Sequence, residues 1–182
     1  MPEEDRRLAE LLNAAAPSAA GTRVAAIDGR SGSGKSALAA ALARRTGAQV
    51  VAMEQLYGGW DGLREGIGRL AQMLAALAAG EPAAVPRYDW ARARWLEPGR
   101  LAAPEILIVE GVGSGALAAS EHIGLLAWIE LPEALRRERA MQRDGETYEG
   151  HWERWRAQED AYIRSDRTPQ RAQIVLPLGQ SA

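Results

Sequence analysis

Short apolar runs alternate along the chain with longer segments of helical period. The runs expected to form strands are Arg23 to Asp28, Gln49 to Met53, Ile106 to Glu110, Leu125 to Leu131 and Gln173 to Leu176. One intervening segment places its apolar residues on a single helical face, at spacings of three and four: Leu63, Ile67, Leu70, Leu74 and Leu77. This alternation predicts a three-layer α/β/α fold, with a five-stranded parallel sheet between two layers of helices.

Length, composition and charge narrow the class of protein. A chain of 182 residues that is 47% hydrophobic predicts a single domain over 1–182. Its formal net charge of -2 gives no basic field for a nucleic-acid backbone, so we expect no nucleic-acid partner. No apolar run reaches a membrane-spanning length, and without cysteines or a secretory leader the expected location is the cytoplasm. The oligomeric state stays open, a homo-oligomer included.

A glycine-rich loop follows the first predicted strand. Residues 29–36 read GRSGSGKS, which fits G-x-x-x-x-G-K-[ST] between a strand and a helix. Glycines let main-chain amides surround phosphate oxygens, and the helix N-terminus adds a favourable dipole. The residues expected to contact a nucleoside triphosphate are Gly29, Ser31, Gly32, Ser33, Gly34, Lys35, Ser36 and Ala37.

Lys35 is the only lysine in the chain. A compact ammonium fits between terminal phosphate oxygens as a point charge, where a planar guanidinium would not. We therefore expect Lys35 to contact the transferred phosphate, and the alternative of a chance glycine-rich turn is the weaker one. A GTPase would need a second lysine in its N-K-x-D loop, which this chain lacks.

The run Ile106 to Glu110 predicts the metal side of the site. Its last residue, Glu110, is expected to hold Mg²⁺ together with the hydroxyl of Ser36. The alternative is a carboxylate that only caps a turn.

Across nearly its whole length the chain resembles the uridine kinase and phosphoribulokinase-like branch of P-loop small-molecule kinases. The motifs that carry the resemblance are IDGRSGSGKS at 27–36, MEQLYGGWDGL at 53–63, VPRYDW at 85–90, IVEGVGSG at 108–115, RRERAMQRD at 136–144 and RAQIVLP at 171–177. The resemblance implies a P-loop kinase fold with an arginine-bearing lid, and it implies ATP and Mg²⁺ as cofactors.

By this resemblance Glu54 is the general base that takes the proton of the acceptor hydroxyl. A carboxylate at the carboxyl end of a strand in such a sheet lies in the ligand crevice in any case. The alternative for Glu54 is an Mg²⁺ or arginine contact only. Related sequences often carry a second acid at the position of Gln55.

The resemblance also implies an acceptor pocket lined by Glu54, Tyr57, Tyr88, Asp89 and Trp90. Tyrosine, carboxylate and indole together suit a sugar or a base. Pyrimidine nucleoside kinases of this type have a histidine five residues after the tyrosine, where this chain has Ala93. For Trp90 ordinary core packing is an alternative of similar weight.

The segment RRERAMQRD resembles the lid of these kinases. Arg136, Arg139 and Arg143 fall at spacings of three and four, which predicts one cationic helical face over the triphosphate. Arg139 is expected to act on the transferred phosphoryl group, and Arg136 and Arg143 to bind the nucleotide. The alternative is a solvated face paired with nearby glutamates.

Other conspicuous residues are expected to be structural. Asp61 is predicted to cap the helix that begins near Leu63, and a substrate contact is the weaker alternative. His122 and His151 have no ligand spacing. A buried stripe is predicted on a late helix from Trp152, Trp155, Ala161 and Ile163.

Taken together, the sequence predicts a kinase that transfers the γ-phosphoryl group of ATP to a hydroxyl of a small metabolite, with a nucleoside as the leading acceptor. Another acceptor, such as a sugar, a sugar phosphate or a pantothenate-like molecule, is the alternative within this class. An ATP-binding regulator with weak transfer is the alternative outside it, because of Gln55 and Ala93.

Overall fold

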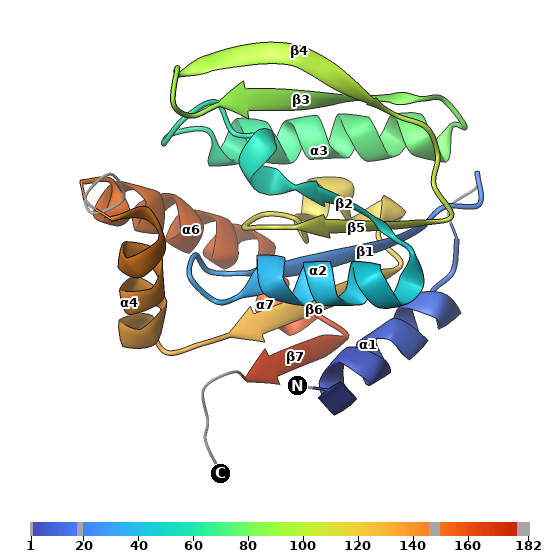
Figure 1. Cartoon of the computed structure of the whole chain (residues 1–182), viewed down its shortest axis with the longest axis horizontal. Helices are drawn as coiled ribbons and strands as arrows, with labels where there is room; N and C mark the ends of the chain where they lie inside the picture. Colours follow the sequence, from blue (N-terminus) through green and yellow to red (C-terminus); the bar gives the residue numbers. More distant parts are fainter. Residues whose placement is uncertain (1, 18–19, 146–149, 178–182) are drawn as a thin grey trace.

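Five parallel strands form the centre of the molecule (Figure 1). The computed structural model describes residues 2–17, 20–145 and 150–177. The sheet has the order β2-β5-β1-β6-β7. Its members are β1 (Arg23–Gly29), β2 (Gln49–Ala52), β5 (Ile106–Glu110), β6 (Leu125–Glu130) and β7 (Ile174–Pro177). The predicted five-stranded α/β fold is confirmed, and each predicted strand lies within one or two residues of its observed bounds.

Helices and short 3-10 turns connect the strands. The α-helices are α1 (Pro2–Ala14), α2 (Lys35–Thr46), α3 (Leu63–Ala78), α4 (Glu133–Asp144), α6 (Trp152–Asp166) and α7 (Thr168–Arg171). The 3-10 turns are η1 (Met53–Gln55) and η2 (Leu117–His122). The predicted stripe on α3 is confirmed for its leucines, which are buried, while Ile67 is half-buried.

Each face of the sheet has its own apolar core, because successive strand residues point to opposite faces. One core joins α1 and α2 to the sheet through Leu8, Leu12, Ala39, Leu42, Ile27, Ile108 and Ala127. The other joins α3 and α6 to the opposite face through Leu70, Leu74, Trp155, Tyr162, Leu107 and Val109. Two helical layers therefore enclose the sheet, as the sequence predicts.

A two-stranded antiparallel hairpin is the element that sequence reasoning missed. It consists of β3 (Ala83–Asp89) and β4 (Arg94–Leu101) and lies along α3, away from the main sheet (Figure 1). Most of β4 is exposed, so it lacks the apolar alternation that marks a strand. Its turn holds Ala93 at a φ of 47°, without a glycine or asparagine to signal it.

The strand order fixes where a ligand can approach. From β1 the chain runs to β2 on one side, and β6 and β7 lie on the other side, so the order reverses at β1. Open α/β sheets bind ligands at the carboxyl ends of the strands at such a reversal point. That place is the loop between β1 and α2. Among the described helices, none combines the length and apolarity that a bilayer crossing requires.

Candidate active site

The glycine-rich loop connects Gly29, the last residue of β1, to Lys35, the first of α2. Gly34 is the N-cap of α2 with a φ of 99°, a left-handed conformation that glycine adopts without strain. Gly32 has a φ of 78°, and a Cβ there would stand 2.2 Å from the carbonyl oxygen of Arg136. The start of α4 therefore packs directly on the loop, and only glycine permits that approach.

Lys35 is folded over this loop. Its Nζ donates a hydrogen bond of 2.9 Å to the carbonyl oxygen of Arg30, and only 7% of the residue is exposed. The neighbouring amides of Lys35, Ser36 and Ala37 belong to the first turn of α2, where main-chain N–H groups have no intrahelical acceptor. An ammonium beside a helix N-terminus has the chemistry of a phosphate site.

Ser36 and Glu110 meet at the base of the loop. The Ser36 hydroxyl donates to Oε1 of Glu110 at 3.0 Å. Glu110 ends β5, which pairs with β1 in the register Ile27 to Glu110. Hydroxyl and carboxylate oxygens suit Mg²⁺, which usually takes only one or two carboxylates from a protein and fills its shell with phosphates and water. Among the residues the structure describes, no three acidic or imidazole side chains gather into a metal site. Ser36 and Glu110 together supply the few oxygen donors that a protein usually gives to Mg²⁺.

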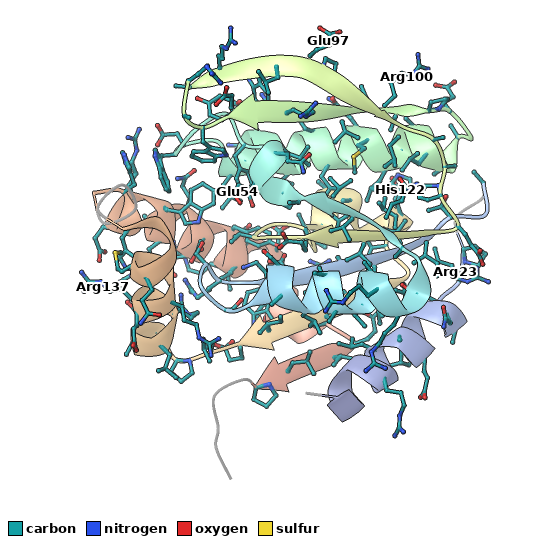
Figure 2. All side chains as sticks on the ribbon, viewed as in Figure 1. Arg23, Glu54, Glu97, Arg100, His122 and Arg137 are labelled. Carbon is teal, nitrogen blue, oxygen red and sulfur yellow. The ribbon has the colours of Figure 1, made fainter. Side chains whose placement is uncertain are left out.

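Glu54 lies at the next strand end along the sheet. β2 pairs with β5 so that Ala52 stands opposite Glu110, and Glu54 follows two residues later in η1. Its side chain is exposed, and Figure 2 places it between the hairpin and the sheet edge that carries α4 and α6. The structure thus brings Glu54, Glu110 and the loop to one edge.

Aromatic rings surround the outer side of η1. Tyr88 and Trp90, at the end of β3, make edge contacts at 5.5 Å, and Trp95 on β4 lies 5.0 Å from Tyr88. Trp60 lies 5.0 Å from Trp90, which joins the loop before α3 to this cluster. Trp90 also donates its indole N–H to the carbonyl of Glu54 at 3.0 Å. Of the predicted acceptor-side residues, Trp90 therefore contacts Glu54, and Tyr88 packs on Trp90.

Two other predicted acceptor residues are already engaged. The carboxylate of Asp89 accepts hydrogen bonds from the main chain and side chain of Arg92, at 3.1 and 2.9 Å, and the guanidinium holds the pKa of Asp89 below its usual range. Tyr57 is buried and donates its hydroxyl to the carbonyl of Val112 at 2.6 Å. Tyr57 therefore belongs to the core that supports the site, where its ring packs on Trp155.

The three lid arginines on α4 do not share one environment. Arg136 is buried and donates to the carbonyl of Leu131 at 3.0 Å and to that of Ser31 at 3.4 Å. Arg139 is exposed, as is Arg137, which Figure 2 shows on the outer side of α4. The side chain of Arg143 lies outside the described residues. Of the two arginines whose side chains the structure describes, Arg136 contacts the glycine-rich loop and Arg139 does not.

α6 contributes contacts that the sequence analysis did not identify. Its Trp155 and Glu159 bind the glycine-rich loop, and Tyr162 reaches the end of β1. Trp152 and Trp155 are buried as predicted, Ile163 is half-buried, and Ala161 is exposed. The sequence contains a signal for Glu159, because its spacing places a carboxylate in the same buried stripe as Trp152, Trp155 and Tyr162.

α6 also holds the loop before α3. Asp61 forms an ion pair with Arg154, so its predicted role as a helix cap is wrong: α3 has Gly62 at its N-cap and no side-chain cap. The reason is that α6 places a guanidinium next to Asp61. His151, at the N-cap of α6, stacks on Trp60 with ring centres 4.6 Å apart. His151 is thus part of the contact between α6 and the acceptor side.

Asp28 ties β1 to the turn after β5. Its Oδ1 accepts from the amides of Gly29 at 2.7 Å and Gly113 at 3.2 Å. Its Oδ2 accepts from the amide of Gly115 at 2.9 Å and the hydroxyl of Tyr162 at 2.7 Å. Burial raises the pKa of the Asp28 carboxyl. The carboxylate fixes the residues that precede the glycine-rich loop.

The sheet order and the glycine-rich loop at its reversal point give this chain the fold of P-loop kinases. No family model matches the chain, and no curated protein matches its sequence. Solved structures do match. One, titled as a possible uridine kinase from Bacillus stearothermophilus, is 20% identical with a TM-score of 0.68, over 96% of this chain and 98% of that one. Another, titled "putative fructose transport system kinase" from Silicibacter sp. TM1040, is 20% identical with a TM-score of 0.64, over 95% and 98%. The predicted resemblance is confirmed at the level of the fold.

Proposed function

We propose that the protein is a kinase that transfers the γ-phosphoryl group of ATP to a hydroxyl of a small metabolite, with a nucleoside as the leading acceptor. The observation that carries this proposal is the convergence of three groups at adjacent strand ends. Lys35 covers the loop, Ser36 contacts Glu110, and Glu54 follows the strand residue that pairs with Glu110. In-line phosphoryl transfer requires an amine that binds phosphate, oxygen ligands for a metal ion, and a separate carboxylate that acts on the acceptor hydroxyl.

Each group has a distinct task. The amides of the loop and Lys35 bind the phosphates, and Ser36 and Glu110 would hold Mg²⁺, which neutralises phosphate charge when bound. Glu54 orients the acceptor hydroxyl and takes its proton. The acceptor oxygen forms a bond to the γ-phosphorus as the bond to the bridging β,γ-oxygen breaks, and ADP leaves with that electron pair.

The aromatic cluster supports a ring-bearing acceptor. Trp90 contacts Glu54, and Tyr88 and Trp60 pack on Trp90. Together these rings offer faces and edges on which a base or a sugar can pack. Asp89, whose carboxylate Arg92 holds, is the proposed polar contact to the acceptor. Tyr57 acts indirectly by supporting η1 from the core.

Arg136 serves the nucleotide site from the start of α4, where it already contacts the loop. The proposed roles of Arg139 and Arg143 require α4 to approach the triphosphate, as lids of kinases do. These two residues remain predictions from the sequence.

A panel of acceptors tests the proposal. Protein is incubated with magnesium ATP and with nucleosides, hexoses, pentoses and pantothenate, and acceptor-dependent ADP release is measured. We expect ADP release with one class of acceptor and none in the Lys35→Ala variant. A protein that shows no affinity for magnesium ATP contradicts the proposal outright.

The same panel separates the alternatives. A sugar acceptor is favoured by the similarity to the structure titled as a fructose transport system kinase, and it predicts ADP release with hexoses but not nucleosides. A nucleotide-binding regulator is favoured by Gln55 beside Glu54, and it predicts tight ATP binding with no acceptor-dependent release at all.

A further inference from the structure

Glu159 is a buried carboxylate from α6 that lies against the glycine-rich loop, and it is only 2% exposed. Its Oε1 accepts a hydrogen bond of 2.9 Å from the amide of Ser31 and one of 3.1 Å from the indole of Trp155. Its Oε2 lies 3.6 Å from the guanidinium of Arg30. Burying a carboxylate costs free energy unless the group is paired and hydrogen-bonded. The contacts of Glu159 therefore indicate what the buried carboxylate does.

The amide that Glu159 binds belongs to the same peptide group as the carbonyl that Lys35 binds. The Ser31 N–H points to Glu159, and the Arg30 carbonyl oxygen accepts from Lys35 Nζ at 2.9 Å. In a trans peptide these two groups point in opposite directions, and no cis peptide occurs in the described chain. Glu159 and Lys35 therefore hold one peptide plane from its two sides.

Trp155 fixes the carboxylate in this position. Its indole N–H lies 2.9 Å from Oγ of Ser31 as well as 3.1 Å from Glu159, and its ring packs on Tyr57 at 4.9 Å. The side chain of Glu159 is thus held by an indole that is itself packed in the core.

The ion pair with Arg30 does not explain Glu159. Arg30 has a closer partner in Asp160, at 2.6 Å, on the same helix. Asp160 has no hydrogen bond to the loop main chain among the contacts described, whereas Glu159 accepts from the Ser31 amide. The feature that distinguishes Glu159 is its bond to the loop.

We propose that Glu159 is a positioning residue for nucleotide binding. It orients the peptide between residues 30 and 31 so that the carbonyl faces Lys35, and so it keeps the ammonium over the loop where phosphates bind. This inference rests on the proposed function and extends it, since Glu159 acts through the loop and needs no contact with the nucleotide.

Loss of the carboxylate would leave the part-buried Ser31 amide without its protein acceptor, a cost that a rotated peptide avoids. Only the fraction of molecules with the original peptide orientation would then present Lys35 correctly. The apparent dissociation constant rises by the inverse of that fraction. We expect an increase on the order of tenfold, which corresponds to the loss of one intramolecular hydrogen bond.

Three variants test this step with the non-hydrolysable ATP analogue AMP-PNP and magnesium, by isothermal titration calorimetry. Glu159→Met keeps the volume but removes the acceptor, and it should weaken binding about tenfold. Glu159→Gln keeps an oxygen that accepts from Ser31 and Trp155, and Asp160→Asn removes the closer Arg30 pair. Both should bind within about threefold of wild type, since neither loses the amide bond. Glu159→Asp is one methylene shorter and should weaken binding as Glu159→Met does. Because it keeps a polar group, it replaces Glu159→Met in the test if the methionine variant does not fold.

A double-mutant cycle with Lys35→Ala separates positioning from general destabilisation. Because Glu159 acts through Lys35, adding Glu159→Met to Lys35→Ala should cause little further loss of affinity by equilibrium dialysis. The inference is overturned if Glu159→Met and Glu159→Asp bind as wild type does, if Asp160→Asn weakens binding equally, or if the losses in the cycle simply add. Wild-type protein that fails to bind AMP-PNP removes the proposed function along with it, which is a distinguishable result.

Discussion

The indole N–H of Trp90 donates a hydrogen bond of 3.0 Å to the main-chain carbonyl of Glu54. This bond joins the residue that follows β3 to η1, and the two bonded residues are 36 positions apart in the chain. Because it engages the main chain, it positions Glu54 without occupying its carboxylate. The hairpin thus supports the residue proposed as the base.

Glu54→Gln should separate catalysis from nucleotide binding. The amide cannot take the acceptor proton, so we expect turnover to fall by about a hundredfold to ten-thousandfold, the usual contribution of a general base. The affinity for magnesium AMP-PNP should not change, because Glu54 lies outside the loop. ADP release and calorimetry measure the two effects. Unchanged turnover would remove Glu54 as the base.

Ser36→Ala and Glu110→Gln should raise the magnesium concentration needed for nucleotide binding. Ser36→Ala removes the hydroxyl that contacts Glu110 at 3.0 Å, and Glu110→Gln removes the negative charge and one of the two carboxylate oxygens. We expect a shift of at least about tenfold, a loss typical even of residues that only orient a metal ligand. The measurement is AMP-PNP affinity across a magnesium titration. Ser120→Ala, which removes a hydroxyl bonded within η2, is the matched control, and an equal shift in that variant would contradict a metal role.

The strands and the loop could be predicted because their signals are local. β1, β5 and β6 are buried apolar runs of strand length, and the glycine-rich loop is a contiguous motif that needs only its two neighbouring elements. The hairpin gave no such signal. The outer strand, β4, is exposed and pairs with β3. β3 in turn packs on α3.

The contacts of α6 with the site could not be predicted for a different reason. Glu159 is 128 positions from Ser31, and Arg154 is 93 positions from Asp61. Their pairing depends on how α6 crosses the carboxyl edge of the sheet, which no local pattern encodes. The same holds for the arginines of α4: periodicity groups Arg136 with Arg139, but the packing of α4 on Gly32 buries only Arg136.

Gly32→Ala should lower both stability and nucleotide affinity. The new Cβ would need a left-handed φ and would stand 2.2 Å from the Arg136 carbonyl, so α4 must move away from the loop. Gly47→Ala is the matched control, since Gly47 also has a positive φ, of 71°, but open space around its Cβ. That control should cost about 1–2 kcal/mol, with unchanged AMP-PNP affinity, and Gly32→Ala should cost more. Urea unfolding and calorimetry measure both effects, and equal losses would show that the contact with α4 is unimportant.

Asp28→Asn should change how stability depends on pH. Burial raises the pKa of the Asp28 carboxyl above its usual value of 3.8, against the opposing effect of its hydrogen bonds. A raised native pKa means that the native state holds this proton more tightly than the unfolded chain does. The contribution of Asp28 to the free energy of unfolding is therefore largest below pH 3.8 and falls as the pH rises through the native pKa.

Asparagine cannot ionise, so the difference in unfolding free energy between wild type and Asp28→Asn should shrink over that pH range. Urea unfolding of both proteins at a series of pH values measures this difference, and the subtraction removes the contribution of the other carboxylates. Asparagine also turns an amide N–H toward one of the four donors that face Asp28, so the variant should be about 1–3 kcal/mol less stable at low pH. A difference that grows with pH would mean that those donors outweigh burial and lower the native pKa.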